Sequence, residues 1–216
     1  MVVGVFDSGV GGESVVEAIK KALPDVEVIF ADDKKNVPYG SKSPDELFKL
    51  VEPILNKLSK KCDVIVVACN TVSTTIINEL RKVIPVPLIA MEPMVKPAAA
   101  LTKSGVIAVC ATPATLASRR YAWLKNEYAH DIKVLEPNCS DWSYLIETNQ
   151  MDHQKIRDRI DTACDEDADV IVLGCTHYHW IEEDIVKIAN GRAEVLQPEQ
   201  PVIEQLKRVL GNSSQH

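Results

Sequence analysis

A chain of 216 residues that is 46% hydrophobic has room for one large domain or two small ones with a solid core. The net charge of −7, without any run of basic residues, argues against nucleic acid or another polyanion as the partner. The apolar runs are too short to span a bilayer, and the first residues lack the charged and apolar regions of a signal peptide. We therefore expect a soluble cytoplasmic protein that does not contact a membrane.

Two hydrophobic periods alternate along the chain. Short β-branched runs predict strands at Val2–Phe6, Val26–Ala31, Asp63–Ala68, Val86–Ala90, Val106–Cys110, Ile132–Leu135, Val170–Leu173 and Glu194–Leu196. Segments with a period near 3.6 predict helices at Glu13–Ala22, Pro44–Lys60, Thr71–Val83, Val95–Leu101, Ala114–Asn126, Asp152–Cys164, Glu182–Ala189 and Pro201–Leu210. This alternation predicts an α/β fold with mainly parallel sheets. The polar tail Gly211–His216 is expected to fray.

Two cysteines lie in near-matching surroundings. Cys69 and Cys175 each follow a run of branched apolar residues and one small residue, and polar residues come next. Such runs are typical of strands buried on both faces of a parallel sheet, whose carboxyl ends form ligand crevices. Nearly equal spacings also separate Asp7 from Cys69 and Thr112 from Cys175. A loose internal repeat of this kind predicts two lobes that place the two thiols across one cleft.

Two thiols that face each other suggest a matched pair of proton-transfer groups, which inversion at a carbon centre requires. The pKa of a free thiol is about 8.5, and its surroundings can change it widely. Asp7 and His177 are placed to hydrogen-bond or exchange a proton near Cys69 and Cys175, respectively. The alternative for His177 is an ordinary loop histidine. We expect the remaining cysteines to be reduced and to pack as small apolar residues.

Two further motifs have competing interpretations. The glycine-rich segment Phe6–Gly12 could bind an anion or a nucleotide, with Asp32 on a ribose, or it could be a simple turn. Its spacing is not GxGxxG, and an acidic Asp7 at the turn would repel pyrophosphate. Cys175, His177 and His179 alternate as a possible zinc motif, but the ligands are crowded and a fourth is missing, so we expect no metal.

Neutral polar groups gather at the same predicted sheet edges. Tyr39, in the loop Asn36–Gly40, could close over a small substrate. Hydroxyl and amide groups suited to the carboxylate and ammonium of a zwitterion are supplied by Asn70, Thr71, Thr112, Thr115 and Thr176.

Taken together, these motifs resemble the glutamate racemases, a branch of the cofactor-independent aspartate/glutamate racemase superfamily. The resemblance runs nearly the whole length, through Val5-Phe-Asp7-Ser8-Gly-Val-Gly-Gly12, Pro38-Tyr39-Gly40, Ala68-Cys69-Asn70-Thr71, Ala111-Thr112-Pro-Ala-Thr115, Leu145-Ile-Glu147 and Leu173-Gly-Cys175-Thr176-His177-Tyr178. It implies two pseudo-symmetric, Rossmann-like lobes, 1–92 plus 196–216 and 93–195, with the active site in the cleft between them. No cofactor or metal is implied.

The resemblance also implies roles for single residues. The catalytic set is Cys69 and Cys175 as the two acid/base groups, with Asp7, His177 and Glu147 in support. The substrate-contacting positions are Ser8, Pro38, Tyr39, Gly40, Asn70, Thr71, Thr112, Thr115 and Thr176. The implied reaction interconverts L- and D-glutamate and supplies D-glutamate for peptidoglycan, and hence for cell-wall biogenesis and cell shape. A homodimer is the default expectation.

The chain departs from the family pattern at a few positions. His179-Trp180 stands where proline-leucine is usual, Glu13 replaces an apolar residue, and Gln197 replaces an acid. None of these changes removes a catalytic residue. Two alternatives stay open: a racemase of aspartate or another small amino acid, and a non-catalytic amino-acid-binding protein on the same scaffold.

Overall fold

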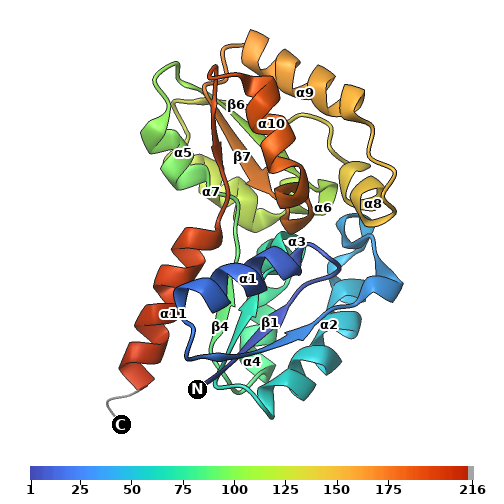
Figure 1. Ribbon diagram of the computed structural model, residues 1–216, viewed down its shortest axis with the longest axis vertical. Coiled ribbons are helices and arrows are strands. Elements are labelled where there is room, and N and C mark those ends of the chain that lie inside the picture. The colour runs from blue at the N-terminus through green and yellow to red at the C-terminus, as the bar shows by residue number, and fades with distance from the viewer. Residues whose placement is uncertain (214–216) are drawn as a thin grey trace.

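The computed structural model describes residues 1–213, which form two four-stranded parallel sheets flanked by helices (Figure 1). The first sheet has the order β2-β1-β3-β4, from β1 (Val2–Phe6), β2 (Glu27–Ala31), β3 (Val64–Val67) and β4 (Leu88–Ala90). The second has the order β6-β5-β7-β8, from β5 (Val106–Ala111), β6 (Lys133–Leu135), β7 (Val170–Gly174) and β8 (Glu194–Leu196). The predicted α/β fold with two similar lobes is confirmed.

The central strands explain where the polar residues emerge. Every residue of β3 and β7 is buried, as expected for strands covered by helices on both faces. Phe6 of β1 pairs with Val67 of β3, and Ala111 of β5 pairs with Gly174 of β7. Parallel pairing therefore brings the residues after β1 and β3 to one edge of the first sheet. It brings the residues after β5 and β7 to the matching edge of the second.

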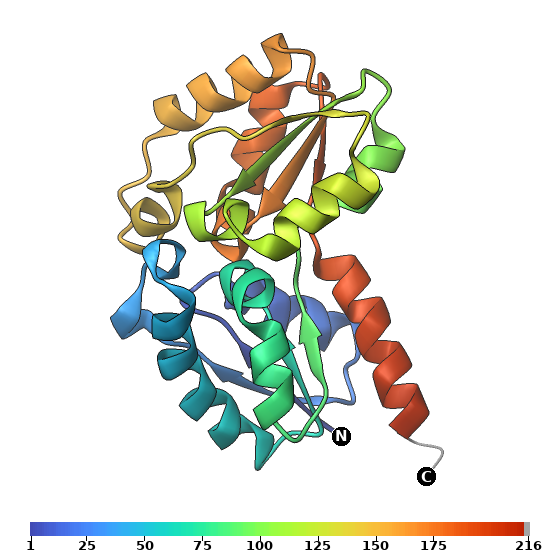
Figure 2. The ribbon, with the colours of Figure 1, turned by 180° about the vertical axis from the view of Figure 1, so that it is seen from behind.

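We call the first sheet and the helices packed on it the first lobe. These helices are α1 (Gly12–Ala22), α2 (Pro44–Ser59), α3 (Asn70–Thr75), α4 (Ile77–Val83) and α11 (Glu199–Ser213). Helix α11 comes from the far end of the chain and lies along α1 and β4 (Figures 1 and 2). Its side chains Val202, Ile203 and Leu206 join the apolar cluster of α1 and the first sheet.

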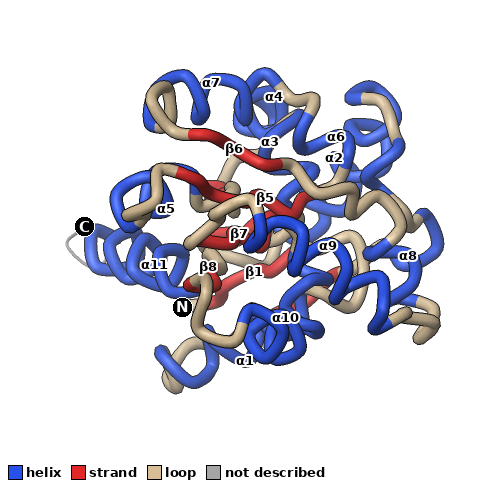
Figure 3. Tube along the Cα trace, turned by 90° about the horizontal axis from the view of Figure 1, so that it is seen from above, coloured by secondary structure: helices blue, strands red, loops and turns tan. Residues whose placement is uncertain are grey.

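The second lobe is the second sheet with its own helices. These are α5 (Val95–Leu101), α6 (Pro113–Leu116), α7 (Arg119–Tyr128), α8 (Trp142–Glu147), α9 (His153–Asp165) and α10 (Glu182–Ala189). Figure 3 shows helices on both sides of this sheet. Three 3-10 helices lie in the connections: η1 (Lys34–Asn36), η2 (Tyr39–Ser41) and η3 (Thr176–Ile181). No helix within residues 1–213 is both long enough and apolar enough to cross a membrane.

Several predicted boundaries were wrong for identifiable reasons. The predicted helix Thr71–Val83 breaks at Ile76, whose φ of −130° is not helical. The predicted helix Ala114–Asn126 is two helices, because Ser118 leaves the helical conformation and its hydroxyl caps α7 by accepting from the Tyr121 N–H. Helix α8 was not predicted at all. Helix α11 continues past its predicted end at Leu210 to Ser213, and the rest of the tail that was expected to fray, residues 214–216, lies outside the described part.

Candidate active site

Each lobe contributes one buried cysteine at the carboxyl edge of its sheet. Cys69 follows β3 and directly precedes α3 as its N-cap residue, whereas Cys175 follows β7 and directly precedes η3 in the same position. Their exposed fractions are 4% and 7%. Burial, above all, raises the pKa of the Cys69 thiol to about 12, and the nearby Asp7 and Cys175 add to the rise. Cys69 is therefore a neutral thiol at neutral pH, and it lies within electrostatic reach of Cys175.

Asp7 organises the glycine-rich loop that follows β1. Its Oδ2 accepts hydrogen bonds from the N–H groups of Gly9 at 3.1 Å and Gly12 at 3.0 Å. Its Oδ1 accepts a third from the Thr176 hydroxyl, which comes from the second lobe. Burial raises the pKa of Asp7, while the His177 charge and these hydrogen bonds oppose the rise. Two N–H groups that could have cradled a bound phosphate are thus directed at a side chain of the protein itself.

His177 links the second thiol to an acid. Its Nδ1 lies 3.8 Å from Cys175 Sγ, and its Nε2 lies 2.7 Å from Glu147 Oε2. Burial alone would lower the pKa of His177, but the hydrogen bonds to Cys175 and Glu147 raise it to about 10. Glu147 has a lowered pKa, chiefly because of the same bond to His177. The pair is therefore an imidazolium and a carboxylate at neutral pH, with the positive charge beside Cys175.

The lobes touch through several of the other predicted residues. The hydroxyls of Thr71 and Thr112 lie 2.9 Å apart across the junction, and Thr112 donates to Thr115 at 3.1 Å. A Cβ atom added to Gly40 would lie only 2.7 Å from Thr112 Cβ, so η2 and α6 approach as closely as a glycine allows. The Val10 N–H of the glycine-rich loop donates to Glu147 Oε2 at 3.2 Å. These contacts describe a closed junction.

The remaining predicted residues lie on the first-lobe side of this junction. The Cys69 thiol donates to the Ser8 hydroxyl at 3.6 Å. Pro38 directly precedes η2, and the hydroxyl of Tyr39 in η2 donates to Asp33 Oδ2 at 2.6 Å. Burial, followed by this bond, raises the pKa of Tyr39, to which Cys69 also contributes.

Asn70 is the one predicted residue with unmet hydrogen-bonding capacity. Its side chain is buried directly after Cys69, and neither the amide nitrogen nor the amide oxygen has a hydrogen-bond partner within residues 1–213. A buried, unpaired amide costs free energy, because both of its ends have lost water. A polar ligand at the junction would supply the missing partners.

Some residues at the junction escaped the sequence analysis. Asp33, Ser14 and Glu199 carried no motif, and His179 was considered only as a metal ligand and as a departure from the family pattern near the second thiol. His179 instead contacts Ser14 and Glu199 in the first lobe. Among the residues that the structure describes, no group of three or more His, Cys, Asp or Glu is arranged to hold a metal ion.

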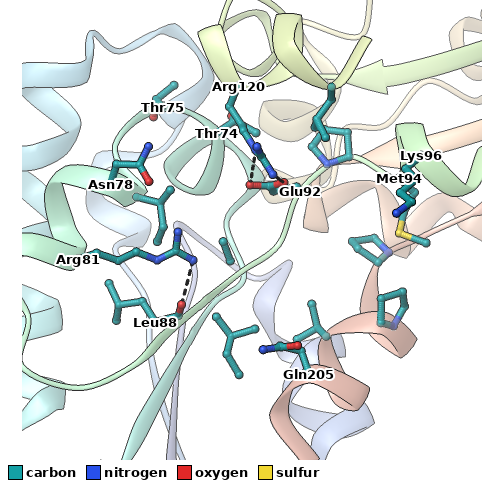
Figure 4. A pocket seen from close by; sticks show the side chains of 18 of the residues that line it. Thr74, Thr75, Asn78, Arg81, Leu88, Glu92, Met94, Lys96, Arg120 and Gln205 are labelled. Carbon is teal, nitrogen blue, oxygen red and sulfur yellow. Dashed lines mark hydrogen bonds and ion pairs between the residues drawn. The ribbon is translucent and has the colours of Figure 1, made fainter. Parts of the chain in front are cut away.

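The molecule also has a cavity of about 940 Å³ between the lobes, away from the cysteines (Figure 4). Helices α4, α5, α7 and α11 and strand β4 contribute to its wall. Arg120 makes a two-pronged ion pair with Glu92, at 2.9 and 2.8 Å, and Arg81 donates to the Leu88 carbonyl at 3.2 Å. None of the predicted site residues lines this cavity.

The fold and the paired thiols define a class, that of α/β racemases built from two similar lobes. Residues 4–204 match the Asp/Glu/Hydantoin racemase family, and the chain belongs to that family. It is accordingly an isomerase, a racemase of the cofactor-independent type. The resemblance to glutamate racemases that the sequence motifs indicated is confirmed.

Individual relatives support this assignment over nearly the whole chain. The chain is 36% identical over 217 residues to glutamate racemase of Clostridium botulinum (strain 657 / Type Ba4). This match covers 98% of this chain and 84% of the relative. It is 35% identical to glutamate racemase of Pseudomonas putida (strain F1), with coverages of 97% and 81%.

Solved structures agree with the sequence relatives. The crystal structure of Escherichia coli glutamate racemase in complex with L-glutamate and the activator UDP-MurNAc-ala has a TM-score of 0.84 and 27% identity, and the match covers 97% of this chain and 82% of that one. The Francisella tularensis glutamate racemase in complex with D-glutamate has a TM-score of 0.80 and 28% identity, with coverages of 98% and 81%.

Proposed function

We propose that the protein interconverts L- and D-glutamate by a two-base mechanism with Cys69 and Cys175. The observation that carries this proposal is the placement of the thiols. One comes from each lobe, each has its own polar partner, and they lie within electrostatic reach of each other at the closed junction. The relatives named glutamate racemase support glutamate as the substrate. Aspartate or another small amino acid is the alternative substrate.

In this mechanism the two thiols act on opposite faces of the substrate Cα. With Cys175 as thiolate, its sulfur removes the Cα proton while the neutral Cys69 thiol delivers a proton to the other face. The reverse direction exchanges the two roles. The His177 imidazolium next to Cys175 stabilises a negative charge on that sulfur, and Glu147 holds the ring in place. On the Cys69 side of the site, Asp7 accepts a hydrogen bond from the glycine-rich loop, and Ser8 accepts one from the Cys69 thiol.

The weak acidity of an amino-acid Cα–H is the main barrier to this reaction. Each tenfold gain in rate requires about 1.4 kcal/mol less activation free energy. A closed site with fixed dipoles around the substrate carboxylate provides such stabilisation, because water is excluded and no reorganisation is needed. The proposed contacts for the substrate's polar groups are Ser8, Pro38, Tyr39, Gly40, Asn70, Thr71, Thr112, Thr115 and Thr176.

The proposed lobe boundaries follow the two sheets except at Leu196, the last residue of β8, which pairs with Val172 in the second sheet. We assign residues 1–92 and 196–216 to the first lobe and residues 93–195 to the second. With this assignment the chain passes from one lobe to the other twice. Supporting this division, the first sheet lies within residues 2–90, and α11 packs on α1 and β4. The proposed biological role is supply of D-glutamate for peptidoglycan, and so for cell shape, in the cytoplasm. A homodimer is the proposed assembly.

The direct test is proton NMR of L-glutamate with the purified protein in D2O, together with circular dichroism. Loss of the Cα proton signal with decay of the optical signal is expected. Cys69→Ser and Cys175→Ser should each abolish the conversion. If glutamate is inert while aspartate or another small amino acid is racemised, the alternative substrate is correct. Inertness of every amino acid tested would reject the catalytic proposal and leave an amino-acid-binding protein.

A further inference from the structure

His179 belongs to the second lobe but makes its hydrogen bonds in the first. It lies in η3, and its side chain is only 3% exposed. Its Nδ1 is 3.2 Å from the Ser14 hydroxyl of α1 and 3.2 Å from Glu199 Oε1 at the start of α11. A single ring nitrogen thus contacts two elements of the opposite lobe.

Both partners of His179 are themselves held firmly. Helices α1 and α11 share one apolar cluster, so their relative position is set by packing. The Ser14 hydroxyl donates to the Gly11 carbonyl at 3.1 Å, and Glu199 Oε2 accepts from the Gln197 amide at 3.3 Å. Although burial alone would raise it, the hydrogen bond from His179 and the charge of its ring lower the pKa of Glu199, so the carboxylate is charged at neutral pH.

The His179 contact lies close to both the thiol and the crossing between the lobes. Helix η3 starts directly after Cys175 and carries Thr176 and His177, so a shift of His179 is passed to these residues over less than two turns. Glu199 stands just beyond β8 and opens α11, where the chain returns to the first lobe. The contact between His179 and Glu199 therefore joins the two lobes next to this crossing.

The unpaired nitrogen of His179 argues against a purely stabilising role. His179 Nε2 is buried and has no hydrogen-bond partner within the described part of the chain. An apolar side chain of similar size would avoid the free-energy cost of burying that nitrogen. It would also lose both hydrogen bonds to the first lobe. The imidazole ring therefore costs folding stability at Nε2 but joins η3 to the first lobe through Nδ1.

We propose that His179 is a positioning residue, which ties η3 to Ser14 and Glu199 and so sets Cys175 and His177 against Cys69. This inference rests on the proposed two-thiol racemisation for its kinetic consequence. A displacement of about 1 Å in a catalytic group can cost about 100-fold in rate. The effect should therefore appear mainly in kcat, since the hydrogen bonds of the His179 ring go to Ser14 and Glu199, which are not among the proposed substrate-binding residues.

The experiment compares His179→Leu with His179→Asn, whose amide can donate from nearly the place of Nδ1. Steady-state kinetics are measured alongside alkylation of each cysteine by iodoacetamide, mapped by peptide mass spectrometry. His179→Leu should lower kcat by about 10-fold or more with a smaller change in KM. It should also speed labelling of Cys69 and Cys175 relative to Cys110, which is fully buried in β5. His179→Asn should restore both, and Glu199→Ala should reproduce the defect without adding to it in the double variant.

The controls separate positioning from general stability. His153→Leu, which removes an exposed histidine paired with Asp184, should leave kinetics and labelling unchanged. Equal acceleration of Cys110 labelling in His179→Leu would mean that the whole fold loosens, and would overturn the proposal. Unchanged kcat and labelling would overturn it as well. If the wild-type protein racemises no amino acid, the proposed function fails, but the labelling ratios still decide whether His179 closes the junction.

Discussion

The Thr176 hydroxyl donates a hydrogen bond to Asp7 Oδ1 at 3.0 Å, and the two residues stand 169 positions apart in the sequence. Asp7 follows the first strand of the first sheet, and Thr176 follows the cysteine after the central strand of the second sheet. This one bond joins the two carboxyl edges beside both thiols. The site is therefore a property of the closed pair of lobes and does not exist in either lobe alone.

Asp7→Asn should weaken both the fold and the proposed activity. The carboxylate accepts three hydrogen bonds, whereas an amide must direct an NH2 group toward at least one of the same donors. We expect the free energy of unfolding to fall by about 1–3 kcal/mol and racemisation to drop sharply. Urea denaturation and the NMR exchange assay measure the two effects. Asp32→Asn, whose carboxylate pairs with Lys34 near the surface, is the matched control and should behave like the wild type.

The charge of His177 should make stability fall as the pH rises. Its pKa is raised from about 6.5 to about 10, so its contribution is complete below pH 6.5 and is lost as the pH rises through 10. The free-energy difference between the wild type and His177→Gln should shrink over that window, by at most about 1.4 kcal/mol per pH unit. Long-range nitrogen-proton NMR of the ring should find both nitrogens protonated at pH 7.5. A neutral ring at that pH would contradict the prediction.

Gly11→Ala should force the lobes apart. The backbone at Gly11 has ordinary αR angles, so alanine is not strained by conformation. Its Cβ would, however, lie 2.6 Å from the backbone of both Thr176 and His177, and backbone cannot rotate out of the way. We expect racemisation to fall at least about 10-fold through misplacement of the second thiol. Gly211→Ala, where an added Cβ meets no atom within 4 Å, is the control. Equal activity of the two variants would show that the junction is looser than described.

Asn70→Leu should separate stability from ligand binding. The buried amide lacks partners in the described residues, so an apolar side chain of similar size should leave the melting temperature of the free protein unchanged or raise it. The same change should remove the increase in melting temperature that glutamate gives the wild type. Thermal denaturation with and without glutamate measures both effects. Asn126→Ala, on the exposed face of α7, should keep the response to glutamate, and a response that survives Asn70→Leu would exclude Asn70 as a ligand contact.

The sequence predicted the strands that position the thiols because those strands have an unusually plain pattern. Strands β3 and β7 are continuous apolar runs that are followed by a cysteine, and such runs are buried on both faces of a parallel sheet. Helix ends were harder to predict. The apolar period continues through Ile76 and Ser118, where local backbone angles and a hydroxyl cap divide single predicted helices in two.

The hydrogen-bond partners of individual side chains were beyond prediction for a different reason. The bond from Tyr39 to Asp33, within the first lobe, joins residues with no periodic or motif relationship. The pairing of His179 with Ser14 and Glu199 depends on the angle at which the two lobes meet, which no single segment encodes. The sequence could therefore show which groups reach the junction, but the partners of each group required the structure.

The return of α11 to the first lobe has a consequence for synthesis on the ribosome. Strands β1, β2, β3 and β4 all emerge before residue 91, whereas the helix that packs Val202 and Leu206 against Val3, Val5 and Met91 begins only at Glu199, after β8. Domains that form early in translation usually need no later segment. Here α1 covers only part of this apolar face of the first sheet until α11 is made, so the first lobe is completed only after the second lobe has been synthesised.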